Sequence, residues 1–384
     1  MIKDIAVLSP LYVTIFWGIV LFTNSPKTKP KFLLGIFMFV TFFLYLTHAF
    51  FFTNNYLAYF QTESLYVLTS LTVFPLYFCY IKLLTTEHSF QKKNLIHFIP
   101  AVLFGVASLI VGLFFTNQQR LEYVDLFVIQ RDRSGMAILS PGSIKSGIFI
   151  LCRLIFVIQV FFYLLKGTIL TQQHDRRIAN FYSNTEGKSL IWVRMVTVTF
   201  LATSIMSITF AIIGRNRFLN DENLLLIPSI IFSTLLYIIG YLGNITNQIL
   251  VVTNRKQFLS IDPQITKSEL MREKLLDLFT QDQIFKNPNL LITNLSDSLQ
   301  TPSEEVSHLI NEEFRTDFND FVNKYRITVA KEQIANDTQN KLTLEWIASD
   351  SGFGSLNSFT RVFKSYEGIT PQKFREICRQ REFS

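Results

Sequence analysis

Three polar residues near the C-terminus have the types and the spacing of a DNA-reading surface. Asn357, Arg361 and Lys364 are four and three positions apart, so an α-helix would present them on one face. A side-chain amide can pair with an adenine edge, while guanidinium and ammonium groups bind guanine edges or phosphates. The spacing indicates a helix that enters the major groove, although the solvated face of an ordinary helix has the same periodicity.

The opposite face of this segment is apolar. The spacing predicts a helix from Ser355 to Glu367 that is closed by Gly368. Between residues 353 and 381, six basic side chains stand against two acidic ones, and this local charge of +4 suits a polyanionic ligand. Four residues recur at helical spacing and are expected to be buried: Leu356, Phe359, Phe363 and Tyr366.

Caps and apolar periodicity divide the rest of the C-terminal part into helices. Thr301 and Pro302 have the pattern of an N-cap followed by a proline at the first helical position, with Glu304 three residues after the cap. The result is two short helix pairs joined by a longer helix. We expect helices over 293–299, 302–314, 317–335 and 344–350, and a last helix that begins at Thr370 and Pro371.

The second helix pair resembles the C-terminal signature of AraC/XylS-type transcription regulators. The resemblance covers roughly residues 275–380. It implies two helix-turn-helix units, joined by a rigid helix, that bind adjacent segments of the major groove. The positions that carry it are Ile347, Ala348, Gly352, Phe353, Ser355, Phe359, Arg361, Phe363, Lys364, Gly368, Thr370, Pro371, Phe374 and Arg375.

The resemblance also implies which side chains contact DNA. The second unit is expected to dominate affinity, because Glu304 and Glu305 lie in the first turn of the first recognition helix and would repel phosphate. Where relatives usually have a glycine after that helix, this chain has residues 314–316, Phe-Arg-Thr. Arg326 resembles a connecting-helix arginine that is either structural or DNA-contacting. The expected contacts are Ser355, Asn357, Ser358, Thr360, Arg361, Lys364 and Arg375 in the second unit, and Ser303, Ser307 and His308 in the first.

The N-terminal two thirds of the chain are apolar. Of the 384 residues 49% are hydrophobic and 39 are phenylalanine, which favours lipid as the solvent. A bilayer requires about 20 consecutive apolar residues per helix. We therefore expect seven membrane spans, near residues 5–23, 32–52, 64–84, 95–116, 144–165, 190–213 and 224–246.

Basic residues in the loops predict the orientation of these spans. Lysine and arginine gather in the first, third and fifth connections, and such loops face the cytoplasm. The second connection has no basic residue, and the fourth and sixth balance their arginines with acidic residues. Seven spans then place the N-terminus outside and the C-terminus inside a bacterial cytoplasmic membrane, on the side where DNA lies.

Three ionisable residues within or beside the spans mark a candidate ligand pocket. Arg153 lies about nine residues into its span, roughly 13 Å at 1.5 Å per residue, which is too deep for easy snorkelling. His48 and Glu63 lie near the external ends of the second and third spans, so the three side chains could line one outward-facing cavity. In the alternative interpretation, His48 and Glu63 are interfacial and Arg153 bonds a helix carbonyl.

Several function classes find no support in the sequence. Cys79, Cys152 and Cys378 lack metal-ligand spacing, and we find no hydrolase, metalloprotease or phosphate-loop motif. We therefore expect no enzyme activity, metal or cofactor. The formal net charge of +7 belongs to the apolar part, because residues 255–384 carry 17 basic and 19 acidic side chains. Overall charge thus reflects membrane topology and not DNA binding.

Together these features predict an all-α chain with a seven-helix membrane bundle and a small helical domain containing two helix-turn-helix units. We expect the membrane domain over 1–247, a linker over 248–265 and the DNA-binding domain over 266–384. The predicted function is a membrane-embedded one-component transcription regulator. Its expected partners are promoter DNA, the bilayer, a small-molecule or envelope signal and a second copy of the chain. The alternatives are a transporter or channel with a DNA-binding tail, and a tethered regulator released by proteolysis.

Overall fold

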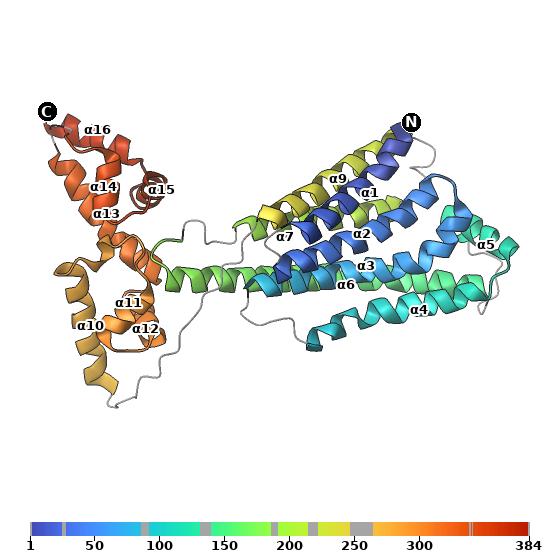
Figure 1. Cartoon of the computed structure of the whole chain (residues 1–384), viewed down its shortest axis with the longest axis horizontal. Helices are drawn as coiled ribbons and strands as arrows, with labels where there is room; N and C mark the ends of the chain where they lie inside the picture. Colours follow the sequence, from blue (N-terminus) through green and yellow to red (C-terminus); the bar gives the residue numbers. More distant parts are fainter. Residues whose placement is uncertain are drawn as a thin grey trace. The chain divides into compact units, whose positions relative to one another are not determined.

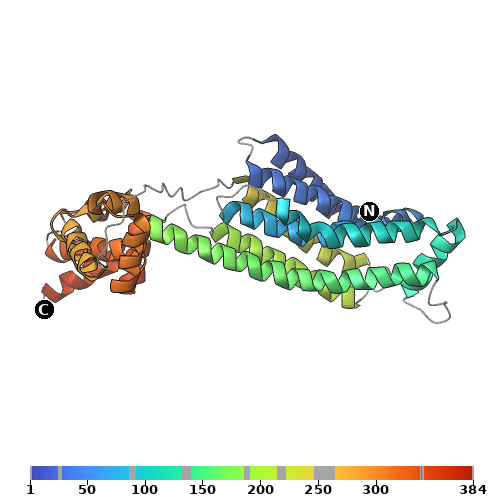
Figure 2. The same cartoon turned by 90° about the horizontal axis from the view of Figure 1, so that it is seen from below.

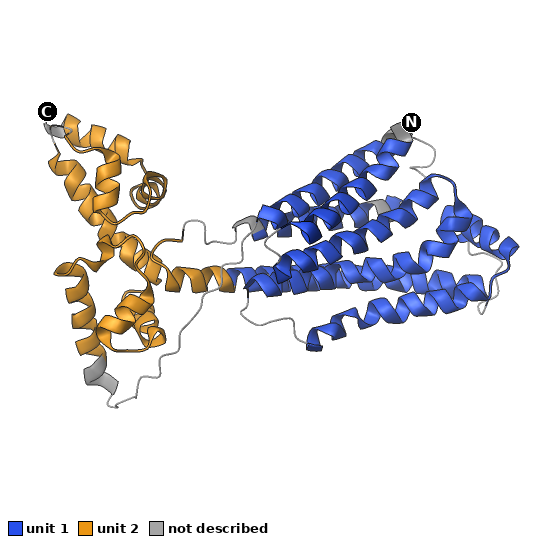
Figure 3. Ribbon diagram, in the orientation of Figure 1, with its two compact units in different colours: residues 1–172, 190–250 blue, residues 173–189, 251–384 orange. Residues whose placement is uncertain are grey.

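The computed structural model describes residues 2–24, 28–85, 92–130, 140–185, 191–213, 222–245, 264–337, 339 and 341–382. Within these ranges the named elements are all helical, and one isolated β-bridge joins Tyr182 to Leu291. The predicted all-α fold is confirmed. The chain divides into two compact units (Figure 3), of which unit 1 comprises Met1–Gln172 and Leu190–Leu250, and unit 2 comprises Gln173–Ser189 and Val251–Ser384.

Unit 1 is a bundle of long apolar helices (Figure 1) in which α3 packs against both α2 and α4, and α1 against α2 and α9. The 3-10 turn η1 (Lys92–Phe98) leads into α4, and α5 is followed by the π-helical turn η2 (Val124–Gln130). The helices are α1 (Ile2–Thr23), α2 (Lys29–Phe52), α3 (Tyr56–Thr85), α4 (Ile99–Leu113), α5 (Asn117–Tyr123), α6 (Pro141–Phe181), α7 (Ile191–Ile213) and α9 (Glu222–Ile245).

Aromatic side chains fill the main core of unit 1. The Phe200 ring of α7 packs against two other rings. Its centroid is 4.5 Å from that of Tyr77 of α3 and 5.2 Å from that of Phe37 of α2, which meets it edge-on. Trp17 of α1 lies directly on Gly240 of α9, where an added Cβ would come within 2.2 Å of the indole. Glycine at 240 therefore permits the close approach of α1 and α9.

The outer faces of unit 1 expose many apolar side chains. Along α4, a row of apolar side chains is more than 40% exposed, including Val102, Leu103 and Leu109. Six of the described helices are long and apolar enough to cross a membrane, and they coincide with six of the seven expected spans. In α7, at the remaining expected span, the apolar stretch Val193–Thr209 is shorter. The seven-span count stays a prediction.

Helix α6 is much longer than the expected span over 144–165. It runs for 41 residues without interruption (Figure 2), which corresponds to roughly 60 Å, about twice the thickness of a bilayer's hydrocarbon core. Its last residues, from Gln173, group with unit 2, so the C-terminal unit includes Gln173–Ser189 in addition to the residues expected from sequence. The expected linker falls almost entirely on 246–263, outside the described residues, and α10 begins at Gln264.

The helices of unit 2 follow the predicted pattern of two short pairs joined by a longer helix. The first pair is α11 with α12, the second is α14 with α15, and α13 joins them (Figure 1). One cap differs from the prediction, since Pro302 occupies the N-cap of α12 and the Thr301 hydroxyl donates to the Leu299 carbonyl. The elements are α10 (Gln264–Thr280), η3 (Ile284–Lys286), α11 (Ile292–Leu299), α12 (Ser303–Glu313), α13 (Phe318–Asn336), α14 (Leu344–Asp350), α15 (Leu356–Glu367) and α16 (Pro371–Glu382).

Helix α13 contributes to two separate hydrophobic cores. Its first half, with Phe318, Phe321 and Val322, packs with α10, α11 and α12, and its second half, with Ile327 and Ala330, packs with α14 and α15. Each helix-turn-helix pair therefore has its own core, and α13 is the element that the two cores share.

Two tight connections depend on left-handed backbone. Gly352, between α14 and α15, has φ +90°, and an added Cβ there would meet the Phe285 carbonyl oxygen at 2.4 Å. Arg315, after α12, has φ +52°, so an arginine takes the left-handed conformation where relatives usually have glycine. The sequence departure at 314–316 thus leaves the turn in place, with a non-glycine residue in a conformation that such residues rarely adopt.

Candidate functional site

The predicted recognition face lies on α15. Asn357, Arg361 and Lys364 are exposed, while Phe359 and Phe363 on the opposite side are fully buried. Ser355 is the N-cap, and its hydroxyl accepts a hydrogen bond from the Ser358 backbone N–H at 3.1 Å. The amide and the two cations therefore project from a helix that is fixed to its core on one side and free on the other. Such a helix can present side chains to a groove.

Three other expected contacts on this unit are less available. Ser358 is only 4% exposed and Thr360 is half-buried. Arg375 is 9% exposed; its Nη2 donates to the Leu342 carbonyl at 3.0 Å and lies 3.8 Å from Asp337. The Arg375 guanidinium holds α16 against the loop before α14. Ser358 and Arg375 therefore both take part in packing within this unit, and their expected DNA contacts stay a prediction.

Tyr366 was expected in the buried stripe of α15, and this prediction is wrong. The side chain is 39% exposed. Its hydroxyl donates to the Asp320 backbone carbonyl at 3.0 Å, which ties α15 to the first turn of α13. Burial of the hydroxyl end and the nearby Asp320 carboxylate raise the pKa of Tyr366 above its usual value. Periodicity located the residue correctly on the inner side of the helix, but a polar partner on another helix draws its ring to the surface.

The recognition face of the first unit is acidic. On α12, Ser303 and Ser307 are half-buried and His308 is exposed. The His308 imidazole lies 3.1 Å from the Glu312 carboxylate, one turn further along. With the exposed Glu304 in the first turn, this face carries negative charge where the α15 face carries positive charge. The contrast favours the expected dominance of the second unit in DNA affinity.

Arg326 is a structural residue of α13. It is 1% exposed, and it donates from Nε to the Phe285 carbonyl at 2.8 Å and from Nη2 to the Asn287 carbonyl at 2.7 Å. Ser183, just beyond α6, supplies further acceptors through its hydroxyl and its carbonyl. Burial lowers the pKa of Arg326 to about 10, so the guanidinium stays charged at neutral pH. Of the two roles left open by sequence, the geometry favours the structural one.

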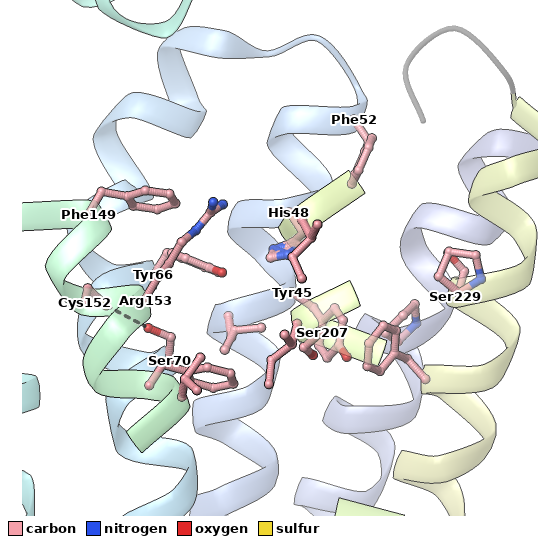
Figure 4. Close-up of a pocket in the computed structure, with 18 of the residues that line it drawn as sticks. Tyr45, His48, Phe52, Tyr66, Ser70, Phe149, Cys152, Arg153, Ser207 and Ser229 are labelled. Atoms are coloured by element: carbon pink, nitrogen blue, oxygen red, sulfur yellow. Dashed lines mark hydrogen bonds between the residues drawn. The ribbon is translucent and has the colours of Figure 1, made fainter. Parts of the chain in front are cut away.

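Unit 1 contains a cavity of about 490 Å³ between α1, α2, α3, α6, α7 and α9 (Figure 4). Arg153 and His48 both line it, as expected from sequence, together with Tyr45, Tyr66 and a mostly apolar wall. The Arg153 guanidinium lies over the Phe149 ring at 4.5 Å, and the His48 and Tyr66 rings are 5.1 Å apart. A few polar side chains thus line an otherwise apolar space, which is the composition of a small-molecule site.

Glu63 does not line this cavity. Its carboxylate lies 3.4 Å from the Lys145 ammonium, with both side chains 1% exposed, and it accepts a hydrogen bond from the Tyr123 hydroxyl at 3.1 Å. The ammonium also donates to the Ser108 hydroxyl and carbonyl. The structure separates Glu63 from Arg153 and His48 and pairs it with a lysine that sequence reasoning passed over. Lys145 lies near the start of α6, where a lysine is usually interfacial. The signal available in the sequence was Glu63, an acidic residue beside an expected span that would need a counter-charge if buried.

Among the described residues, no group of three or more histidine, cysteine, aspartate or glutamate side chains could hold a metal ion. Residues 295–377 match a protein-family model described as a helix-turn-helix domain, a range that runs from within α11 to within α16 and so covers the second helix pair and most of the first. No curated protein and no solved structure matches the chain. The family match and the geometry of α14 and α15 support an AraC-type DNA-binding domain in unit 2 and a DNA-binding transcription regulator as the coarse function of the chain.

Proposed function

We propose that the chain is a membrane-embedded one-component transcription regulator. Unit 1 senses a signal in or outside the cytoplasmic membrane, and unit 2 binds promoter DNA on the cytoplasmic side. The observation that carries the proposal is the presence, in one chain, of an outward-facing Asn357, Arg361 and Lys364 on a helix-turn-helix unit and of six helices long and apolar enough to span a bilayer.

The dimensions of unit 2 suit two consecutive contacts along DNA. Helix α13 has 19 residues and is therefore roughly 28 Å long, close to the 34 Å or so of one DNA turn. Helices α12 and α15 pack on its two halves through separate cores. With α15 basic and α12 acidic, α15 makes the principal base and phosphate contacts, and α12 contributes through Ser303, Ser307 and His308.

The cavity in unit 1 is the proposed input site. Its volume falls within the 300 to 1,000 Å³ or so typical of ligand sites, and its wall is mostly apolar. Arg153, His48 and Tyr66 supply the polar contacts that would orient a bound molecule. A small amphipathic compound, reaching the cavity from the envelope or the bilayer, matches this lining. A second copy of the chain would double the DNA contacts and raise avidity.

The DNA-binding part is tested by selection from a random DNA pool. Full-length protein in lipid nanodiscs should enrich specific fragments. Arg361→Ala and Lys364→Ala should each weaken binding of those fragments by roughly 1 to 3 kcal/mol, while the exposed Lys324→Ala on α13 should change it little. Failure of the wild-type protein to enrich any fragment would contradict the proposal, and equal effects from all three variants would contradict the assignment of the α15 face.

The sensing part is tested in cells by chromatin capture with and without candidate signals. Full-length protein should occupy promoters in a signal-dependent manner. Arg153→Gln and His48→Gln should abolish this dependence while DNA binding in vitro is retained. The control is Arg194→Gln, on α7, because this residue does not line the cavity. Occupancy that never responds to any signal, or that responds equally in the cavity variants, would contradict a sensing role for the cavity.

A further inference from the structure

The four residues Phe181–Asn184, here called the post-α6 segment, are built into the DNA-binding unit. Phe181, the last residue of α6, is 7% exposed and belongs to the core of the first helix-turn-helix unit. Tyr182 forms an antiparallel bridge with Leu291, and the Ser183 N–H donates to the Leu290 carbonyl at 3.1 Å. Main-chain pairing and core burial together hold this segment against the start of α11.

Helix α13 grips the other side of the segment. The Asn319 side-chain amide donates to the Ser183 carbonyl at 2.7 Å. Arg326, two turns further along the same helix, donates from Nη2 to the Ser183 hydroxyl at 3.2 Å and from Nη1 to the Ser183 carbonyl at 3.4 Å. Ser183 is 1% exposed. Ser183, a single buried residue, thus accepts hydrogen bonds from two residues of α13, the helix that joins the two helix-turn-helix units.

Arg326 is also the residue at which the two helix-turn-helix units meet. It lies on α13 between Val322, in the first core, and Ile327, in the second. Its guanidinium bonds the carbonyls of Phe285 and Asn287 on the first side and lies 5.7 Å from the centre of the Phe353 ring on the second. These acceptors are neutral, so the buried charge depends on every one of them being present.

We propose that the post-α6 segment is a positioning element that sets the relative orientation of the two helix-turn-helix units for DNA. The inference rests on the proposed function of unit 2. Departure of the segment would remove the Ser183 acceptors from the buried Arg326 cation and expose Phe181, and the junction between the cores would have to repack. Asn184 also lies beside the second helix-turn-helix unit. Its side-chain nitrogen is 3.2 Å from the point that a Cβ atom would occupy if one were added to Gly354.

The covalent connection gives the element a regulatory consequence. Helix α6 begins at Pro141 in unit 1 and ends at Phe181, so the positioning element is the direct continuation of a helix whose Arg153 lines the cavity. A ligand-dependent shift of α6 would act on the Ser183 contacts without passing through residues 246–263. The spacing between the two DNA contacts is then the property that the membrane unit controls.

The test compares two double variants of the full-length protein in nanodiscs. Ser183→Ala with Asn319→Ala removes the hydroxyl acceptor of the segment and the α13 amide that donates to the Ser183 carbonyl. Ser298→Ala with Asn336→Ala makes the same chemical changes at exposed positions of α11 and α13. The probe is a DNA fragment enriched by the wild-type protein, alongside a copy with one base pair inserted between the two footprinted contacts. Hydrogen exchange at the Ser183 amide reports whether the segment has loosened.

Wild type and control should prefer the original spacing by about tenfold or more, because an inserted pair costs on the order of one or two mismatched contacts. In the Ser183/Asn319 variant this preference should fall below about threefold, and exchange at the Ser183 amide should rise by about tenfold, the equivalent of a single lost hydrogen bond. A spacing preference equal to that of the control overturns the inference and leaves the proposed function standing. A wild-type protein that enriches no DNA overturns both.

Discussion

The buried pair of Glu63 and Lys145 offers a quantitative test of the packing of unit 1. The carboxylate and ammonium are 3.4 Å apart, and each side chain is 1% exposed. At this distance and an effective dielectric constant of about 20, their attraction is roughly 5 kcal/mol. Because each charge has been taken out of solvent, removal of one partner leaves the other buried without its principal counter-charge.

Glu63→Gln and Lys145→Met should therefore each lower the free energy of unfolding by about 3 to 5 kcal/mol. The double variant should lose much less than the sum, because the glutamine amide and the methionine thioether leave no buried ion. A coupling free energy of about 2 kcal/mol or more is expected from contact partners of this kind. Tyr123 and Ser108 also form hydrogen bonds with these two charged groups. The loss in each single variant should therefore lie toward the upper end of the range of about 3 to 5 kcal/mol.

The measurement is unfolding of the full-length protein from mixed micelles by titration with sodium dodecyl sulfate, followed by circular dichroism. Glu122→Gln and Lys166→Met provide matched controls, since both residues are exposed on the same unit. They should change the unfolding free energy by less than about 0.5 kcal/mol. Single variants at Glu63 and Lys145 that behave like these controls, or that add without coupling, would refute the reasoning.

Three further predictions address packing, topology and DNA contact. Gly240→Ala should destabilise unit 1 by about 1 to 3 kcal/mol, because the added methyl group meets the Trp17 ring. The control Gly147→Ala adds a methyl group into open space and should be close to neutral. Equal shifts in melting temperature for the two variants would contradict this packing. A topology reporter fused at Gln130 should be accessible from outside the cell, and a cytoplasmic signal would show that the span count or its direction is wrong. Arg375→Ala removes a hydrogen bond to the Leu342 carbonyl, so it should lower the melting temperature of unit 2 and leave the DNA footprint unchanged. An unchanged melting temperature with an altered footprint would assign Arg375 to the DNA-contacting residues.

Local signals gave the helices of unit 2 with good accuracy. Helix α14 has the predicted bounds, Leu344–Asp350, and Gly368 closes α15 as predicted, while Ser355, expected as the first helical residue, is its N-cap. Such caps succeed because they satisfy backbone groups within one turn of the chain. The prediction at Thr301 failed for a related reason: the Thr301 hydroxyl bonds backward to Leu299, and the turn starts one residue later, at Pro302.

Residues whose roles depend on distant partners were not accessible from spacing. Arg375 has the type and position of a DNA-contacting surface residue, and Tyr366 lies in the apolar stripe of its helix, yet each side chain donates a hydrogen bond to a backbone carbonyl of another element. Lys145 and Glu63 are far apart in the sequence, and only the packing of α6 beside α3 and α4 brings the two charges together. An amphipathic period shows which side of a helix faces inward, but it does not show which polar atoms wait on the neighbouring helix.

The amino-acid sequence by itself determined that this chain is all-helical, that its first part is apolar enough for a bilayer, and that its end carries an AraC-type helix-turn-helix pattern with Asn357, Arg361 and Lys364 outermost. These properties follow from composition, caps and periodicity, which act over a few turns. Tertiary structure alone decided that the continuation of α6 belongs to the DNA-binding unit. It also decided that Arg326 is buried and donates a hydrogen bond to the Ser183 hydroxyl. A buried cation must take its hydrogen-bond acceptors from wherever the folded chain supplies them, and no local pattern records that source.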